Sequence, residues 1–208
     1  MAFVMTLALT AMSPAAPPPA LLGRLAAHHA YSARHCERTG AYAAYLAARL
    51  GLPASQVTDA RVAGGLHDLG KISVPVAILD KPGKLTAQEW AVVRGHPALG
   101  AKLAQEAGLS PAVCAGIRGH HERPDGTGYP DGLKGDAIPL LARIVSVADT
   151  FDAVTSRRSY QPPRAFSAAL AILRQAAGTQ LDAKLVATFL LDEAALKALL
   201  DRQPHSPD

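Results

Sequence analysis

Cysteine and aromatic residues are scarce in this sequence. The chain has two cysteines, Cys36 and Cys114, among 208 residues, and aromatic residues make up 5% of it. Two cysteines are too few for a disulfide framework, so we expect reduced thiols and a cytoplasmic protein. Because aromatic rings are few, a buried core must consist largely of Ala, Leu, Val and Ile, and this composition favours helices over sheets.

Charged residues and long apolar runs are also limited. Charged residues make up 18% of the chain, against roughly 25% in an average soluble domain. No apolar run reaches the roughly 18 to 20 residues of a membrane span, so we expect no membrane partner. Lys and Arg exceed Asp and Glu by 21 to 17, a net charge of +4. These basic residues are scattered, which suits an anionic small molecule and does not indicate nucleic acid.

The length predicts one domain with an appendage, because a domain has about 150 residues. Hydrophobic residues make up 49% of the chain, which excludes a disordered tail protein. Residues 1–20 are predicted to be a flexible apolar and proline-rich leader, and 21–208 a single domain. The apolar run at 2–12 is typical of a signal peptide, but no Lys or Arg precedes it and 13–19 is a poor cleavage site. Secretion is therefore the less favoured alternative.

The remainder of the chain is predicted to be a succession of helices with short loops. Apolar residues at helical spacing predict a helix over 35–50, and an apolar segment predicts another over 139–155. Residues 164–202 have room for two or three more. Local signals predict further helix ends, namely Ser55 as the cap of a helix to about Leu69, a capping box at Thr86–Glu89, Pro97 and Pro111 as first helical residues, and Ser110 as an N-cap. We therefore expect an all-α helical bundle.

One segment, residues 122–137, breaks this helical pattern. It contains Gly126, Gly128, Gly132 and Gly135. Such a density of glycine predicts a long structured loop, and long loops inside compact domains usually carry function.

Several histidine and aspartate residues lie at the ends of the predicted helices or inside an apolar helix. His67 and Asp68 follow an apolar helical turn, His120 and His121 directly precede the glycine loop, and Asp149 lies within an apolar helix. A buried carboxylate is normally paired or bound to a metal. Each observation also has a simpler interpretation. His67 and Asp68 could form a hydrogen-bonded helix end, and His120 and His121 could be solvated. Asp149 could pair with Arg143 or Arg157. His28, His29 and His205 are interpreted as ordinary surface residues.

Taken together, the order of these residues indicates a metal site. Imidazoles and carboxylates suit divalent iron, manganese or zinc, and two ions need about this many ligands. Helical bundles build dinuclear sites from side chains on facing helices. The residues in chain order are His35, His67, Asp68, His96, His120, His121 and Asp149.

The motifs that contain these residues resemble the HD superfamily of metal-dependent phosphohydrolases. The runs 67–71 (HDLGK) and 81–86 (KPGKLT) carry the superfamily resemblance. The runs 120–130 (HHERPDGTGYP) and 148–155 (ADTFDAVT) narrow it to the HD-GYP subfamily. The resemblance extends from about His35 to Leu190 and implies a helical bundle with the metals near its centre.

The resemblance also implies how the ligands divide. One metal would be held by His35, His67, Asp68 and Asp149. A second would be held by Asp68, His96, His120 and His121, so that Asp68 bridges the two ions. Some members bind a third metal through a glutamate one turn before the first histidine, where this chain has Tyr31. We therefore predict two divalent ions per chain, iron or manganese by analogy with the family.

The family's activity is hydrolysis of cyclic di-GMP to linear pGpG, in some members onward to GMP, by a hydroxide that bridges the metals. Asp68 and Lys71 would be the catalytic residues, because Lys71 can neutralise charge on the transition state. The simpler interpretation is that Lys71 is a cation at the C-terminal end of a helix, where the helix dipole favours positive charge. The predicted substrate contacts are Lys71, Gly128, Tyr129, Pro130 and Arg158, with Gln161 in place of a commonly basic residue. Tyr129 is equally well interpreted as a packing residue.

Three alternatives accompany this prediction. The nearest is a phosphodiesterase for another cyclic dinucleotide of the cyclic GMP-AMP type. The second is a diiron oxygenase on the same scaffold, which the glycine loop disfavours. The third is a non-catalytic module that responds to cyclic di-GMP and binds a diguanylate cyclase domain or another signalling protein, which the complete ligand set disfavours.

Overall fold

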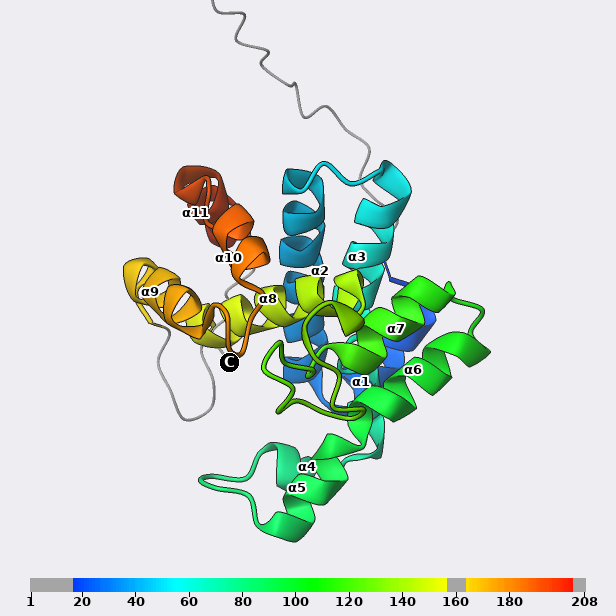
Figure 1. Cartoon of the computed structure of the whole chain (residues 1–208). Helices are drawn as coiled ribbons and strands as arrows, with labels where there is room; N and C mark the ends of the chain where they lie inside the picture. Colours follow the sequence, from blue (N-terminus) through cyan, green and yellow to red (C-terminus); the bar gives the residue numbers. More distant parts are fainter. Residues whose placement is uncertain (1–16, 157–163, 204–208) are drawn as a thin grey trace, which may run out of the picture.

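The computed structural model describes residues 17–156 and 164–203 (Figure 1). All regular structure in these ranges is helical except for one isolated bridge between Ala177 and Leu181, so the predicted all-α fold is confirmed. No helix in the described ranges is both long enough and apolar enough to cross a membrane. The α-helices and the two 3₁₀ helices (η) are α1 (Pro19–His28), α2 (Ala30–Arg49), α3 (Ala54–Leu66), η1 (Leu69–Ser73), α4 (Val76–Leu79), α5 (Ala87–Arg94), α6 (His96–Glu106), α7 (Pro111–Gly119), η2 (Gly135–Ala137), α8 (Leu140–Thr155), α9 (Phe166–Ala176), α10 (Ala183–Phe189) and α11 (Glu193–Arg202).

Several predicted helix ends are confirmed. Thr86 and Glu89 form the reciprocal capping box of α5, and the Ser110 side chain accepts a hydrogen bond from the Val113 amide at the start of α7. Three helices fill the C-terminal segment, as the sequence allowed. Residues 1–16, which make up most of the predicted leader, lie outside the described ranges.

Other predicted ends are wrong. Helix α2 begins at Ala30 because the His29 side chain caps it by accepting a hydrogen bond from the Ser32 amide. The N-cap of α3 is Pro53, so Ser55 lies inside the helix. Helix α3 ends at Leu66 rather than near Leu69, because a tighter 3₁₀ turn follows, in which the Lys71 amide donates to the Asp68 carbonyl. In α6 the first helical residue is His96, and Pro97 is the second.

Helix α8 runs through the middle of the bundle and packs against α2, α3 and α7 (Figure 1). Phe151 of α8 is fully buried, and its ring makes edge-to-face contacts with Tyr42 of α2 and Phe189 of α10. Edge-to-face packing of buried rings adds to the energy of burial. Helices α9, α10 and α11 extend this core on one side, whereas α4 and α5 lie apart from it and bury no residue.

Close backbone contacts hold the elements that carry the histidines. A Cβ atom on Gly40 of α2 would lie 2.7 Å from the Arg61 carbonyl oxygen of α3. A Cβ atom on Gly70 of η1 would lie 2.0 Å from the His96 carbonyl oxygen at the start of α6. Because only glycine permits these approaches, α2 lies against α3 and η1 lies against α6 at backbone distance.

The predicted loop at 122–137 is confirmed as an irregular segment, apart from the short η2, and a buried carboxylate organises it. Glu122 is 2% exposed and accepts hydrogen bonds from the amides of Asp131, Gly132 and Leu133. Gly128 allows the loop to close on itself, because a Cβ atom there would lie 2.4 Å from the Arg123 amide nitrogen. The loop is thus folded against the end of α7 by its own first residues.

We predict that Gly70→Ala destabilises the protein by about 1–3 kcal/mol, because the added methyl must push η1 away from α6. Gly23→Ala is the matched control: Gly23 is exposed in α1 and nothing lies within 4 Å of an added Cβ atom. This control should gain about 0.5–1 kcal/mol from helix propensity. Urea unfolding followed by circular dichroism measures both changes, and equal stability of the two variants would contradict the prediction.

Candidate metal centre

The structure brings all seven predicted ligand side chains together inside the bundle. They come from α2, from the segment joining α3 to η1, from the start of α6, from the end of α7 and from α8. His67, Asp68, His96 and His120 are each 1% exposed, and His35 is 5% exposed. The Asp149 side chain is 19% exposed and faces the open side of the cluster.

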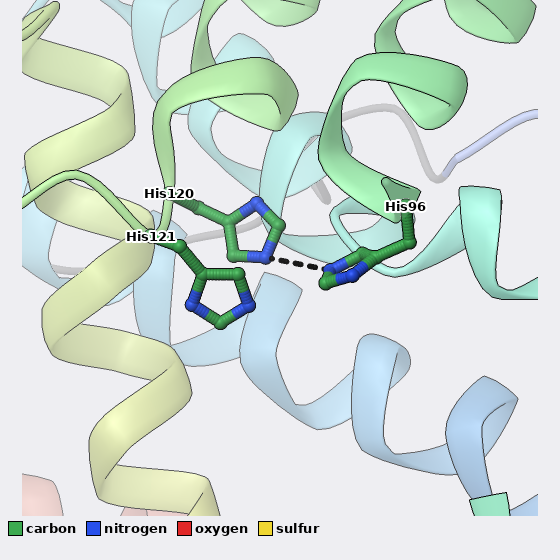
Figure 2. A group of neighbouring side chains, drawn as sticks. All are labelled: His96, His120 and His121. Carbon is green, nitrogen blue, oxygen red and sulfur yellow. Dashed lines mark hydrogen bonds between the residues drawn. The ribbon is translucent and has the colours of Figure 1, made fainter. Parts of the chain in front are cut away.

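These side chains form two groups of three. His35, His67 and Asp149 offer ligand atoms within 4.8 Å of one another, and so do His96, His120 and His121 (Figure 2). Within the second group, Nε2 of His96 lies 3.3 Å from Nε2 of His120. The two groups match the division of ligands between two ions that the family resemblance implies, apart from Asp68.

Asp68 lies between the two groups. Its Oδ2 atom is 3.9 Å from Nε2 of His35 and 3.6 Å from Nε2 of His67. Its Oδ1 atom is 3.2 Å from Nε2 of His96. One carboxylate oxygen thus faces each group, which is the placement that a bridging carboxylate needs.

A repeated hydrogen bond orients three of the histidines. Nδ1 of His67, His96 and His120 each lies 2.6–2.7 Å from the carbonyl oxygen three residues earlier. An Nδ1–H that donates to a carbonyl leaves the Nε2 lone pair free for a metal. All three Nε2 atoms face the cluster, so these rings are held in the tautomer and orientation of a ligand.

His35 is oriented by a carboxylate instead. Its Nδ1 atom lies 2.7 Å from Oδ2 of Asp152, which is fully buried and also accepts two hydrogen bonds from Arg38, at 2.7 and 2.9 Å. Its Nε2 atom lies 3.0 Å from Oδ1 of Asp149. Burial opposes the charged imidazole, but the bonds to Asp149 and Asp152 outweigh it and raise the pKa of His35 to about 9.

Several other ionisable groups of the cluster have the protonation states that metal binding needs. Burial lowers the pKa of His67 and His120, and it lowers the pKa of His121 to about 3, so these rings are neutral. Burial alone would raise the pKa of Asp68, but the neighbouring Lys71 ammonium lowers it well below its usual range. Neutral imidazoles and ionised carboxylates are the forms that ligate divalent cations, so these residues fit such ions, and His35 would have to lose its Nε2 proton to bind one.

Cys36 also lies near the cluster but does not fit a ligand. Its sulfur is 3.7 Å from Nδ1 of His67, the atom that already bonds the Gly64 carbonyl. Burial and the charge of Asp68 raise the pKa of the thiol well above its ordinary value. Its sulfur forms a further group of three with His67 and Asp68, but the raised pKa disfavours the thiolate that would bind a metal.

Two cavities open onto the cluster. The first has a volume of about 360 Å³ and includes His29, Lys71 and Lys81 in its lining. The second has a volume of about 390 Å³ and lies along the glycine loop and α8. Both volumes are in the range of small-molecule sites. Four residues line both cavities: Trp90, His121, Tyr129 and Asp149.

Some of the predicted catalytic and substrate-contact residues line the two cavities, and others do not. Lys71 donates to Oδ2 of Asp68 at 2.6 Å and lines the first cavity. Gly128 lines the second cavity, and Tyr129 lines both, with its ring stacked on that of His121. Pro130 follows Tyr129 through a cis peptide bond and lies outside the linings of these two cavities. Arg158 and Gln161 lie outside the described residues.

One of the simpler interpretations, the pairing of Asp149 with Arg143, is wrong. Asp149 is not paired with Arg143, because that guanidinium lies 3.0 Å from Asp136 and 2.8 Å from Asp182 while Asp149 bonds His35. Arg157, the other partner considered, lies outside the described residues.

His28 and His29 are not ordinary surface residues either. Nε2 of His28 forms a hydrogen bond of 2.8 Å with the Val74 carbonyl oxygen. His29 caps α2 through Nδ1, and its Nε2 lies 3.0 Å from Oδ1 of Asp80. His29 also lines the first cavity. The contacts with Val74 and Asp80 could not be predicted from the sequence, because these partners are 46 and 51 residues away. His205 lies outside the described residues.

Asp152 and Trp90 border the cluster and its cavities but are not among the residues predicted from the sequence. Asp152 is three residues after Asp149 on α8, and this spacing places both carboxylates on one face of the helix. Trp90 is the single tryptophan of the chain and lies on α5, a helix that buries none of its residues. The spacing of Asp149 and Asp152 and the single tryptophan are visible in the sequence, but the proximity of Asp152 and Trp90 to the cluster is not.

Comparison with known proteins is consistent with this geometry. The profile of the family described as "HD domain" matches residues 20–185. The cyclic di-GMP phosphodiesterase response regulator RpfG of Xanthomonas campestris is 43% identical over 78% of this chain and 44% of its own length. The 3'3'-cGAMP-specific phosphodiesterase 3 of Vibrio cholerae is 38% identical over 86% of this chain and 39% of its own length. The chain therefore spans less than half of these relatives.

A solved structure shows the same fold. Bd1817 of Bdellovibrio bacteriovorus, described as an HDG"Y"P protein, superimposes with a TM-score of 0.63 at 23% identity, over 78% of this chain and 51% of its own. The family profile covers most of the chain, and the HD and glycine-tyrosine-proline motifs occur in the expected order. The chain therefore belongs to the HD domain family and, within it, to the HD-GYP group.

Proposed function

We propose that this chain is a metal-dependent phosphodiesterase that hydrolyses cyclic di-GMP to pGpG. The observation that carries the proposal is the pair of three-ligand groups with Asp68 between them, exposed to two cavities of ligand size. The relatives named as cyclic di-GMP phosphodiesterases support the choice of substrate.

Two divalent cations, iron or manganese, are proposed as cofactors. His35, His67, Asp68 and Asp149 would hold one, and Asp68, His96, His120 and His121 the other. When bound, such ions polarise a phosphoryl group and make water a nucleophile near neutral pH. Tyr31 stands one turn before His35 and lines the first cavity, where an acidic residue would be needed for a third ion.

Lys71 is proposed to stabilise charge on the reacting phosphate. Burial alone would lower its pKa, but Asp68 raises it, so Lys71 stays an ammonium at neutral pH. Its side chain is 23% exposed and borders the first cavity. A fixed positive charge in this position favours the transition state, in which negative charge on the phosphoryl oxygens increases. Asp68 orients the ammonium group through the 2.6 Å contact.

The substrate contacts remain part of the proposal. Gly128 and Tyr129 form the cavity walls, and Pro130 is proposed to set the shape of the loop next to them. Arg158 is proposed as a phosphate or base contact, because its planar guanidinium matches phosphate oxygens.

A second candidate substrate is 3'3'-cGAMP, because a relative named as specific for it is 38% identical over 86% of this chain. The oxygenase alternative has no comparable support, and the non-catalytic module is disfavoured because the ligand set is complete. A cytoplasmic location is proposed because Cys36 and Cys114 are free thiols. A diguanylate cyclase domain or another signalling protein stays a prediction as partner.

Replacement of the bridging residue tests the proposed centre. We expect Asp68→Ala to bind fewer than two ions per chain and to lose turnover of cyclic di-GMP, because both sites lose a ligand. Anaerobic purification with metal analysis, followed by chromatography of pGpG and GMP, measures both effects. Asp136→Ala is the control, because its side chain is 99% exposed. Full metal content and activity in Asp68→Ala would refute the centre.

Lys71→Gln tests the role of the ammonium group. We expect kcat to fall about 10²- to 10³-fold with metal content retained, because the change removes positive charge and leaves every proposed ligand. Lys102→Gln serves as the control, because Lys102 is 70% exposed and pairs only loosely with Glu106. A loss of metal from Lys71→Gln would show that Lys71 supports the centre rather than the transition state.

Asp152→Asn tests the hydrogen bond that orients His35. We expect metal affinity to fall about 10- to 100-fold, because an outer carboxylate both orients a histidine ligand and increases its basicity. Competition with a chromogenic chelator measures the affinity without reference to turnover, and Asp136→Asn is the exposed control. Affinity equal to that of the unmodified protein would show that Asp152 only supports the fold.

A further inference from the structure

Trp90 lies at the edge shared by the two cavities and has no role in the core. Its residue is 48% exposed, and its helix α5 buries none of its residues. The ring contacts of the core are made by Tyr42, Phe151 and Phe189, and Trp90 lies outside this cluster. An exposed large ring bordered by polar groups is typical of a binding surface rather than of a structural contact.

Tyr129 also lines both cavities, and its ring already packs against two other side chains. His121 stacks on it with ring centroids 4.8 Å apart and planes 27° apart. Cζ of Arg94 lies over the ring, 4.7 Å from its centroid. Trp90 is exposed, whereas Tyr129 is half-buried, so the indole is the more accessible of the two rings for a ligand.

The neighbours of Trp90 indicate what kind of ligand would use this ring. Two of the four residues common to both cavities, His121 and Asp149, belong to the candidate metal centre. Lys71 and Lys81 line the first cavity, and Arg94 and Arg123 line the second. A ligand with a flat ring on Trp90 would thus have its anionic part between the metal ligands and these cations. A purine nucleotide has this combination of groups.

We propose that Trp90 is the stacking platform for one purine base of the substrate, at the boundary between two nucleotide subsites. This inference rests on the proposed phosphodiesterase function and names a binding residue for it. Stacking on an aromatic ring is favourable for every base, because each base has a π-face. Trp90 is therefore expected to supply affinity for guanine and adenine alike, and discrimination between them must come from other contacts.

Fluorescence tests the platform directly, because Trp90 is the only tryptophan in the chain. The metal-loaded full chain is titrated with GMP and, as a ligand with phosphate but no base, with ribose 5-phosphate. We expect saturable quenching by GMP and none by ribose 5-phosphate. N-acetyltryptophanamide in solution controls for collisional quenching. No saturable change with GMP, or an equal change with ribose 5-phosphate, would overturn the proposal.

Steady-state kinetics with cyclic di-GMP give an independent readout. We expect Trp90→Leu to raise KM about tenfold with kcat nearly unchanged, because a stacking contact binds ground state and transition state alike. Trp90→Phe keeps a ring and should recover most of the loss. Val92→Ala is the control: Val92 is 44% exposed on the same helix and lines neither cavity. An unchanged KM in Trp90→Leu would overturn the platform.

The two experiments separate this inference from the function on which it rests. If the unmodified protein hydrolyses no cyclic dinucleotide but GMP still quenches Trp90 saturably, the proposed function fails and the purine platform stands. If the protein hydrolyses cyclic di-GMP and Trp90→Leu matches it in KM, the function stands and the platform fails.

Discussion

A carboxylate that is 1% exposed has to be compensated by its surroundings, and Asp68 imposes this requirement at the centre of the bundle. Isolated burial of a charge is among the most costly changes in a folded protein. Lys71 offsets the cost from one side, at 2.6 Å, and the proposed cations, held in part by His96 of α6, would offset it from the other. The segment joining α3 to η1 therefore has to lie against α6, and the glycine at position 70 makes that approach possible.

The histidines around Asp68 are positioned by backbone rather than by surface loops. His67, His96 and His120 each follow the end of a helix (α3, α5 and α7), where the last carbonyl groups have no helical partner. Each ring bonds one of these carbonyls, which satisfies the backbone and points the second ring nitrogen inward. The same three bonds thus stabilise helix ends and prepare the site, so the fold and the centre depend on one another.

The open side of the centre is built from less constrained parts of the chain. The glycine loop is held by Glu122, while α4 and α5 lie apart from the bundle and bury nothing (Figure 1). Segments with few buried contacts open at low free-energy cost. A tightly packed centre with less constrained walls would suit the proposed phosphodiesterase, which has to admit a bulky anionic ligand and hold its reacting phosphate in one place.

The sequence by itself determined the features that depend on local interactions and on motif order. These are the all-α class, the capping box at Thr86, the start of α8 after Pro139 and the set of candidate ligands. Only the tertiary structure decided which ligands share a group, which atom of Asp68 faces each group, and that Asp152 orients His35. The reason is separation along the chain. Asp152 is 117 residues from His35, and the two meet only because α8 packs against α2, which local sequence patterns do not predict.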